Sequence, residues 1–330
     1  PATDAPASEA KSDAKPASTT EPIDLAWKFE EGTDLKLKDV QEIVIAMTGP
    51  AASNTSITVS TYSAIKFTRV NDDGSADATL TFTRIVTEGQ AQPPQIPGRP
   101  APEGDGKFSY DTKNPNAAKS PAGGRMMGPD AESLKMFDAM IEKPIKFKVT
   151  KTGIVSEVSG TQAITDKMVA DAQAKPAPEW AATNPDMAAQ IKQSEIDGIR
   201  KMFSDSAIKD VLEEMLRVVP EKSIKMKTNW SRPTNGPGMI SAMMKGQGGE
   251  TTGTVNNSIV EFEDNIASIK TATAMTFKAD QMPEQMQVQP LQGTGEIIFD
   301  NESGTLIEST NDLKTTMTMS IPSFGEGMAE

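Results

Sequence analysis

The chain of 330 residues contains neither cysteine nor histidine. Without cysteine there is no disulfide, no thiolate metal site and no iron–sulfur cluster. Without histidine there is no imidazole general base, no Ser-His or Cys-His nucleophile pair and no histidine-ligated metal. Aromatic residues make up only 5% of the chain, which is thin for the stacking platforms of a glycosidase cleft. We therefore expect a protein that is not an enzyme and that carries no cofactor or metal.

Positive charge and long apolar runs are also in short supply. The chain has 33 Lys and Arg against 46 Asp and Glu, a net charge of −13. Nucleic-acid binding depends on Lys and Arg that neutralise phosphates, so a nucleic acid is not an expected partner. No stretch approaches the run of about 18 apolar residues that marks a membrane-spanning helix, so no transmembrane span is expected.

Residues 1–21 contain only Ala, Pro, Ser, Thr and scattered charged residues. Such a segment cannot bury enough apolar surface to offset its ordering entropy, which predicts a disordered tether. A tether of this kind follows the cleavage site of an exported protein or the lipid-bearing cysteine of a bacterial lipoprotein. One expectation is therefore a lipid anchor on a removed N-terminal residue, and the alternative is a chain that has been trimmed.

Period-2 alternation of apolar and polar residues predicts strands along most of the remaining chain. In the first half it marks residues 23–29, 57–67, 78–82 and 145–149. The segment NDDG (71–74) joins two of these strands, because its glycine supplies the positive φ that a tight hairpin turn needs. A strand, a turn and a return strand recur at 260–277.

Several phrases of the first half return in the second. EKPIKFK (142–148) is matched by EKSIKMK (221–227), and each follows a helical pattern, near 131–142 and near 206–217. Ser204 or Asp205 is a plausible N-cap for the second helix. We predict an α+β fold of two related antiparallel β-sheets of long hairpins, each with a packed helix, arranged as an internal duplication.

The predicted halves are residues 22–171 and 191–330, joined by a hinge at 172–190. Proline and glycine concentrate in 88–130 and 233–253, which are predicted to be long loops.

Acidic residues gather at the predicted turns, as in Asp72-Asp73, Glu263-Asp264 and Asp300-x-Glu302. Paired carboxylates can hydrolyse a glycosidic bond. Asp and Asn also favour turns for backbone reasons, and that is the preferred interpretation of these clusters. A carboxylate-based hydrolase is the least favoured function.

These segments together resemble an uncharacterised bacterial family of predicted exported lipoproteins, a domain of unknown function. The resemblance covers about residues 23–320 and is carried by LAWKFEEGTDLKLK (25–38), VNDDGSADATLTFTR (70–84), FSYDTKNP (108–115), KTGIVSEVSG (151–160) and GTGEIIFDNESGTLIES (293–309). It implies an extracytoplasmic β-rich protein of the bacterial periplasm or cell surface. It implies no activity and transfers no catalytic residue.

The leading functional hypothesis is a non-enzymatic extracytoplasmic binding or carrier protein for a lipid or another apolar small molecule. The candidate ligand-lining residues are Phe67, Phe82, Met275 and Phe277. The alternative for all four is ordinary packing between sheet and helix. The alternative function is a structural or assembly component of the cell surface or of a protein complex, whose partner is another protein.

Overall fold

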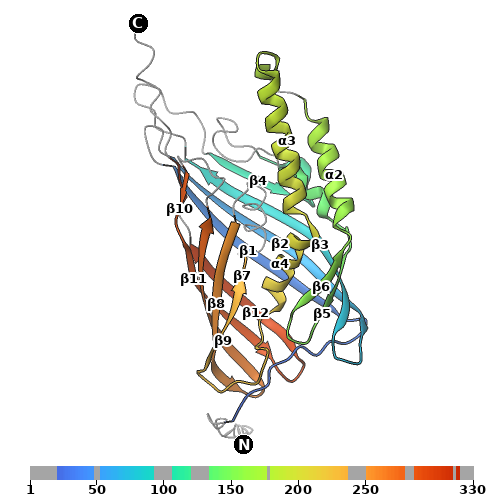
Figure 1. The fold of residues 1–330 in the computed structure, drawn as a ribbon, viewed down its shortest axis with the longest axis vertical. Coiled ribbons are helices and arrows are strands. Elements are labelled where there is room, and N and C mark those ends of the chain that lie inside the picture. Colours follow the sequence, from blue (N-terminus) through green and yellow to red (C-terminus); the bar gives the residue numbers. More distant parts are fainter. Residues whose placement is uncertain are drawn as a thin grey trace, which may run out of the picture.

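The computed structural model describes residues 21–47, 53–92, 106–119, 134–176, 179–236, 250–278, 286–314 and 317–319. Within these ranges two antiparallel sheets of long strands lie one against the other, with helices along one side (Figure 1). The predicted α+β class with two antiparallel sheets is confirmed. Residues 1–20 of the tether predicted at 1–21, and most of the two Pro/Gly-rich segments, lie outside the described residues.

The first sheet has six strands, with β1-β2-β3-β5-β6 as its order and β4 paired to β3. Its strands are β1 (Asp34–Met47), β2 (Ser53–Val70), β3 (Ala76–Ala91), β4 (Lys107–Asp111), β5 (Ile145–Val149) and β6 (Val155–Ser159). The second sheet has five strands in the order β12-β11-β9-β8-β7. Its strands are β7 (Asn229–Thr234), β8 (Glu250–Glu263), β9 (Ile266–Lys278), β11 (Leu291–Asp300) and β12 (Thr305–Lys314). A separate pair joins β10 (Met286–Val288) to β13 (Met317–Met319).

The described helices lie mostly between the two sheets in sequence. They are α2 (Thr161–Ala174), α3 (Pro185–Met202), α4 (Asp205–Leu216) and the short 3-10 helices η1 (Pro115–Ala117), η3 (Lys135–Met140) and η4 (Glu179–Ala182). Helices α2 and α3 form a hairpin that projects beyond the strands, whereas α4 lies close to β6 and β7 (Figure 1). In the described part of the chain, no helix is both long enough and apolar enough to cross a membrane.

The helix predicted near 206–217 is α4. Its N-cap is Ser204, whose side chain accepts a hydrogen bond of 3.2 Å from the backbone N–H of Ala207. The helix predicted near 131–142 is the shorter 3-10 helix η3, and residues 131–133 lie outside the described ranges. The segment 172–190, predicted to be a hinge, contains the end of α2, all of η4 and the first turn and a half of α3.

The two sheets share a topology, because each contains five strands whose order across the sheet follows their order in the chain, once β4 and β10 are left out. The strands β1, β2, β3, β5 and β6 correspond in order to β7, β8, β9, β11 and β12. The repeated phrase EK-x-IK-x-K does not follow this correspondence. Residues 142–148 lead into β5, the fourth strand of its meander, whereas residues 221–227 precede β7, the first strand of the other. The phrase therefore gives no support to a duplication.

The segment before β1, residues 21–33, is bound to elements that are remote in sequence. Its apolar residues alternate as predicted for a strand, but it forms no ladder. Ile23 makes an isolated bridge with Ile224, and the N–H of Lys28 donates to the carbonyl of Gly304 (3.1 Å). The segment thus ties the β11–β12 turn and the chain that precedes β7 to the start of the first sheet. We call residues 21–33 the N-terminal strap.

Trp27 anchors this strap. Its ring is 3% exposed, stacks on Phe29 with centroids 6.0 Å apart, and meets Phe299 of β11 edge-on at 5.4 Å. Its indole N–H donates to the carbonyl of Leu216 at the end of α4 (2.8 Å), and its backbone N–H donates to Lys151 in the β5–β6 turn (2.9 Å). One residue therefore joins both sheets to α4.

We expect Trp27→Ala to lower the free energy of unfolding by about 3–5 kcal/mol, the usual cost of truncating a buried aromatic residue. Trp27→Phe keeps a ring but leaves the Leu216 carbonyl without its donor, so we expect a loss of about 1–3 kcal/mol. Chemical denaturation of both variants measures these losses. A change below about 0.5 kcal/mol in Trp27→Ala contradicts the anchoring role.

Gly153 in the β5–β6 turn approaches the same carbonyl. It has φ +82°, and a Cβ added to it would lie 2.0 Å from the Leu216 oxygen. Gly74, in the β2–β3 turn, has the similar φ of +79° but nothing within 4 Å of an added Cβ. The two glycines therefore have similar backbone conformations, but only Gly153 lies too close to the Leu216 carbonyl to accept a Cβ.

We expect Gly74→Ala to cost about 1–2 kcal/mol, the price of a left-handed backbone for a residue with a Cβ. Gly153→Ala should cost about 1–3 kcal/mol more, because the added methyl group forces the turn away from α4. Denaturation of both variants in parallel measures the difference. Equal losses would show that the turn does not pack on the end of α4.

Candidate functional site

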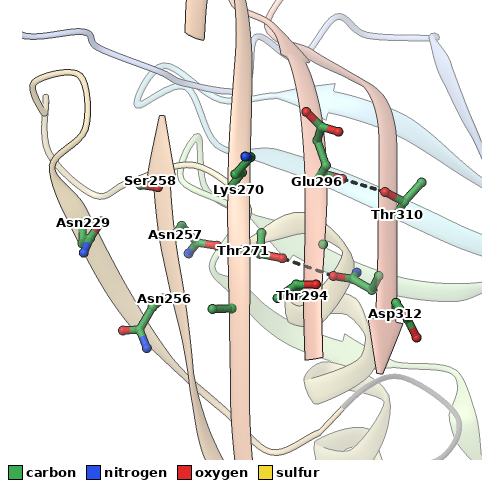
Figure 2. Close-up of a pocket in the computed structure, with 13 residues that line it drawn as sticks. Asn229, Asn256, Asn257, Ser258, Lys270, Thr271, Thr294, Glu296, Thr310 and Asp312 are labelled. Atoms are coloured by element: carbon green, nitrogen blue, oxygen red, sulfur yellow. Dashed lines mark hydrogen bonds between the residues drawn. The ribbon is translucent and has the colours of Figure 1, made fainter. Parts of the chain in front are cut away.

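The outer face of the second sheet carries a shallow polar groove of about 730 Å³. It crosses all five strands, and Figure 2 shows its lining residues along them. The side chains that point outward into it are Asn229, Asn256, Ser258, Lys270, Thr294, Glu296, Thr310 and Asp312. Lys270 and Glu296 are directly opposite each other on β9 and β11, and both are exposed. These groups are solvated amides, hydroxyls and charges on an open sheet face.

The inner face of the same sheet, which contacts the core, is also partly polar. Its apolar end contains Ile259, Ile269 and Ile297, which lie side by side on β8, β9 and β11. The next inward row along the strands contains Trp230 on β7, directly opposite Asn257 on β8, which in turn is opposite Thr271 on β9. Asn257 is 2% exposed. Buried polar groups thus replace the apolar core over this row.

Arg232 extends the polar region toward α4. Its guanidinium makes a bidentate ion pair with Glu214 of α4, with Nη–Oε distances of 2.8 and 2.7 Å. Thr234 also donates to Glu214 (2.8 Å). Arg232 is 8% exposed, so the pair is largely removed from water. The pair fixes α4 against β7, and it neutralises both charges.

The inner face of the first sheet has a matching polar band. Asp39 of β1 is opposite Thr61 of β2, and in the next inward row Gln41 is opposite Val59, which is opposite Thr87 of β3. Asp39 is exposed, yet protein surrounds it closely enough that burial raises the pKa of its carboxyl, against a smaller lowering by the hydrogen bond from Gln41 Nε2 (2.5 Å).

Five buried side-chain atoms of the described residues have no hydrogen-bond partner, and all five belong to these two inner bands. They are Gln41 Oε1, Thr87 Oγ1, Trp230 Nε1, Arg232 Nε and Asn257 Nδ2. Buried polar atoms in native proteins are nearly always paired with protein, water or a ligand. Their confinement to the two facing sheets makes the inner faces the candidate site.

The predicted site residues have different surroundings. Phe67 and Phe82 are 5% and 4% exposed and belong to the apolar core, where Phe67 packs on Phe29 at 4.7 Å. Met275 is 1% exposed and lies against Gly253 of β8. The side chain of Phe277 lies outside the described residues. None of the four lines the outer groove, and their role in ligand binding stays a prediction.

The acidic clusters are turn residues in the structure. Asp73 accepts hydrogen bonds from the hydroxyl (2.6 Å) and the N–H (2.9 Å) of Ser75, and these lower its pKa. Asp300 accepts from the hydroxyl (2.7 Å) and N–H of Ser303, which likewise lower its pKa. Asp264 has φ 49° in the two-residue β8–β9 turn. Among the described residues, no three acidic side chains gather as a metal site would require.

The inner polar bands were missed by sequence reasoning, although β1 carries a signal for its own band. The inward positions of this strand include Leu35, Leu37, Asp39 and Gln41, so two polar residues follow two apolar ones. In β8, Asn257 interrupts Val255 and Ile259 in the same way.

The sign of the Asp39 pKa shift predicts how its replacement acts. A carboxyl with a raised folded-state pKa favours the protonated form, so stability is lost as pH rises through the folded pKa. We expect Asp39→Asn to be more stable than wild type at pH 7 and equally stable well below the ordinary pKa of 3.8. Asp73→Asn is the control of opposite sign, because the pKa of Asp73 is lowered, and it should be less stable at pH 7. Denaturation midpoints between pH 3 and 7 test both. A less stable Asp39→Asn at pH 7 contradicts the assignment.

Comparisons with known proteins give a family and little more. The model of DUF6263, a family of unknown function, matches residues 103–306. Among curated proteins, none matches the chain. A solved structure concerned with lipid–protein interactions in lipovitellin is similar over 88% of this chain and 25% of that chain, with 10% identity and a TM-score of 0.27. The chain thus spans about a quarter of the length of that protein, and the low score carries no argument about function.

Proposed function

The chain belongs to DUF6263, a family of unknown function, and we propose that it is a non-enzymatic extracytoplasmic protein that binds or carries an apolar or amphipathic small molecule. The molecule is held between the inner faces of the two sheets, beside α4. The extracytoplasmic location is supported by the Ala-, Pro-, Ser- and Thr-rich composition of residues 1–21.

The observation that carries this proposal is the confinement of the unpaired buried polar atoms to the two inner faces. A filled apolar core would leave no such atoms, and solvent-exposed polar residues would be paired with water. Next to the polar bands, the apolar core contains ring contacts among Trp27, Phe29, Phe67 and Phe299. An amphipathic molecule between the two sheets would contact both the apolar core and the polar bands.

A second candidate function is an assembly role, and one observation favours it. Met187 and Ile191 of α3 are 56% and 53% exposed and lie one helical turn apart. They belong to the helical hairpin that projects from the body of the molecule (Figure 1). Exposed apolar residues that share a helix face are typical of contact surfaces. They are only two residues, so the binding function is preferred.

Native mass spectrometry of the protein purified from its own source tests the proposal. We expect an apolar adduct at fixed stoichiometry that solvent extraction releases. Thr61→Phe places a ring in the inner band beside Asp39 and should abolish the adduct, whereas Thr254→Phe places the same ring on the exposed outer face of β8 and should retain it.

A bare monomer in the wild type would contradict the binding function. Additional copies or other proteins that adhere without any small molecule would instead favour the assembly role.

A further inference from the structure

We propose that Trp230, Arg232 and Asn257 form the polar end of the ligand site, and that they select an uncharged group rich in acceptor oxygens, such as an ester carbonyl. This inference rests on the proposed function, because it names the part of the amphipathic molecule that the second sheet recognises. Three observations support it: the three side chains lie on one face, their unpaired atoms are hydrogen-bond donors, and the charge of Arg232 is already neutralised by Glu214.

The three side chains lie together on one face of two paired strands. Trp230 and Asn257 are directly opposite each other in the antiparallel pair of β7 and β8. Side chains in such positions have Cβ atoms about 4.5–5.5 Å apart. Arg232 is two residues further along β7 and therefore points to the same face. Glu214 of α4 confirms that this face looks toward the interior, because it binds Arg232 from that side.

All three unpaired atoms are hydrogen-bond donors. They are the indole N–H of Trp230, the Nε–H of Arg232 and the amide Nδ2 of Asn257, and each is fully covered from solvent. Indole and guanidinium nitrogens can only donate. The group that completes this cluster must therefore supply acceptors, and a saturated hydrocarbon cannot.

The charge balance decides between a neutral acceptor and an anion. The guanidinium of Arg232 already holds the carboxylate of Glu214 through both terminal nitrogens. An anionic ligand would place a second negative charge beside Glu214 in a largely buried position, where an unbalanced charge is costly. The remaining Nε–H can still donate to an uncharged oxygen. The cluster thus favours a carbonyl or ether oxygen over a carboxylate or phosphate.

The experiment compares three probes delivered from cyclodextrin to the full chain: methyl decanoate, decanoate, and tridecane, an alkane with as many non-hydrogen atoms as the ester. Trp230→Phe removes one donor and keeps an aromatic ring, and Asn257→Leu removes another with little change in size. Gln292→Leu is the matched control, because Gln292 carries an amide on the exposed outer face of β11. Thermal melts establish that each variant is folded.

We expect the wild type to bind the ester more tightly than the other two probes. Trp230→Phe and Asn257→Leu should each weaken ester binding about three- to tenfold, the effect of one hydrogen bond, and leave tridecane binding unchanged. Gln292→Leu should bind all three probes as the wild type does. If Asn257→Leu fails to fold, Trp230→Phe alone decides the outcome.

Two results would overturn the inference while leaving the carrier function in place. One is ester binding by Trp230→Phe as tight as that of the wild type, which would mean that buried water satisfies the donors. The other is tighter binding of decanoate than of the ester. A wild type that binds none of the probes overturns the inference and also counts against the proposed function.

Discussion

The burial of Trp27 is the interaction on which the arrangement of the two sheets depends. The two meanders are built from local hairpins, and each could form from its own stretch of chain. The N-terminal strap joins them, because its anchor contacts β11, the end of α4 and the β5–β6 turn at once. The ion pair of Arg232 with Glu214 adds a contact between β7 and α4. A polar N–H on a large apolar ring is suited to this position, because it satisfies the Leu216 carbonyl at the end of α4 while filling the gap between sheets. This contact holds the two sheets together at one end.

From that closed end the inner faces change character along the strands. Aromatic and branched residues fill the base, and two polar bands follow, one on each sheet. Asn257 and Thr87 are 2% and 1% exposed, so they are as deeply buried as the core residues beside them. Polar residues at such positions destabilise a protein that merely needs to fold, since each unpaired atom loses its water without gaining a partner. We interpret their presence as a requirement of binding.

The sequence predicts the parts of the fold that local chemistry decides. The NDDG turn, the hairpin at 260–277 and the N-cap at Ser204 are each confirmed at the expected residues. The strap shows the limit of this reasoning. Its alternation of apolar residues is real, but tertiary contacts rather than strand partners satisfy its backbone. Helix α2 was missed because its buried stripe contains Thr161, Thr165 and Ala172 alongside only one isoleucine and one methionine. That stripe is too weakly apolar to be recognised from the sequence alone.

The candidate site could be predicted less well than the fold, for a related reason. Large apolar residues such as Phe67 and Phe82 attract attention in a sequence, yet they form the closed part of the core. The informative residues are polar ones at inward positions, and their inward direction is known only once the register is known. Trp230 and Asn257 are 27 positions apart in the chain and become neighbours only through the pairing of β7 with β8.

The central claim is that a ligand binds at the inner face of the second sheet, near Trp230, and not at the closed end of the core, near Trp27. Nuclear magnetic resonance of the protein with ¹⁵N-labelled tryptophan tests this directly, with signals assigned by Trp230→Phe and Trp27→Phe. On titration with methyl decanoate, the indole N–H signal of Trp230 should shift, whereas that of Trp27, already bonded to Leu216, should not. A stationary Trp230 signal under conditions in which the ester binds would contradict the account.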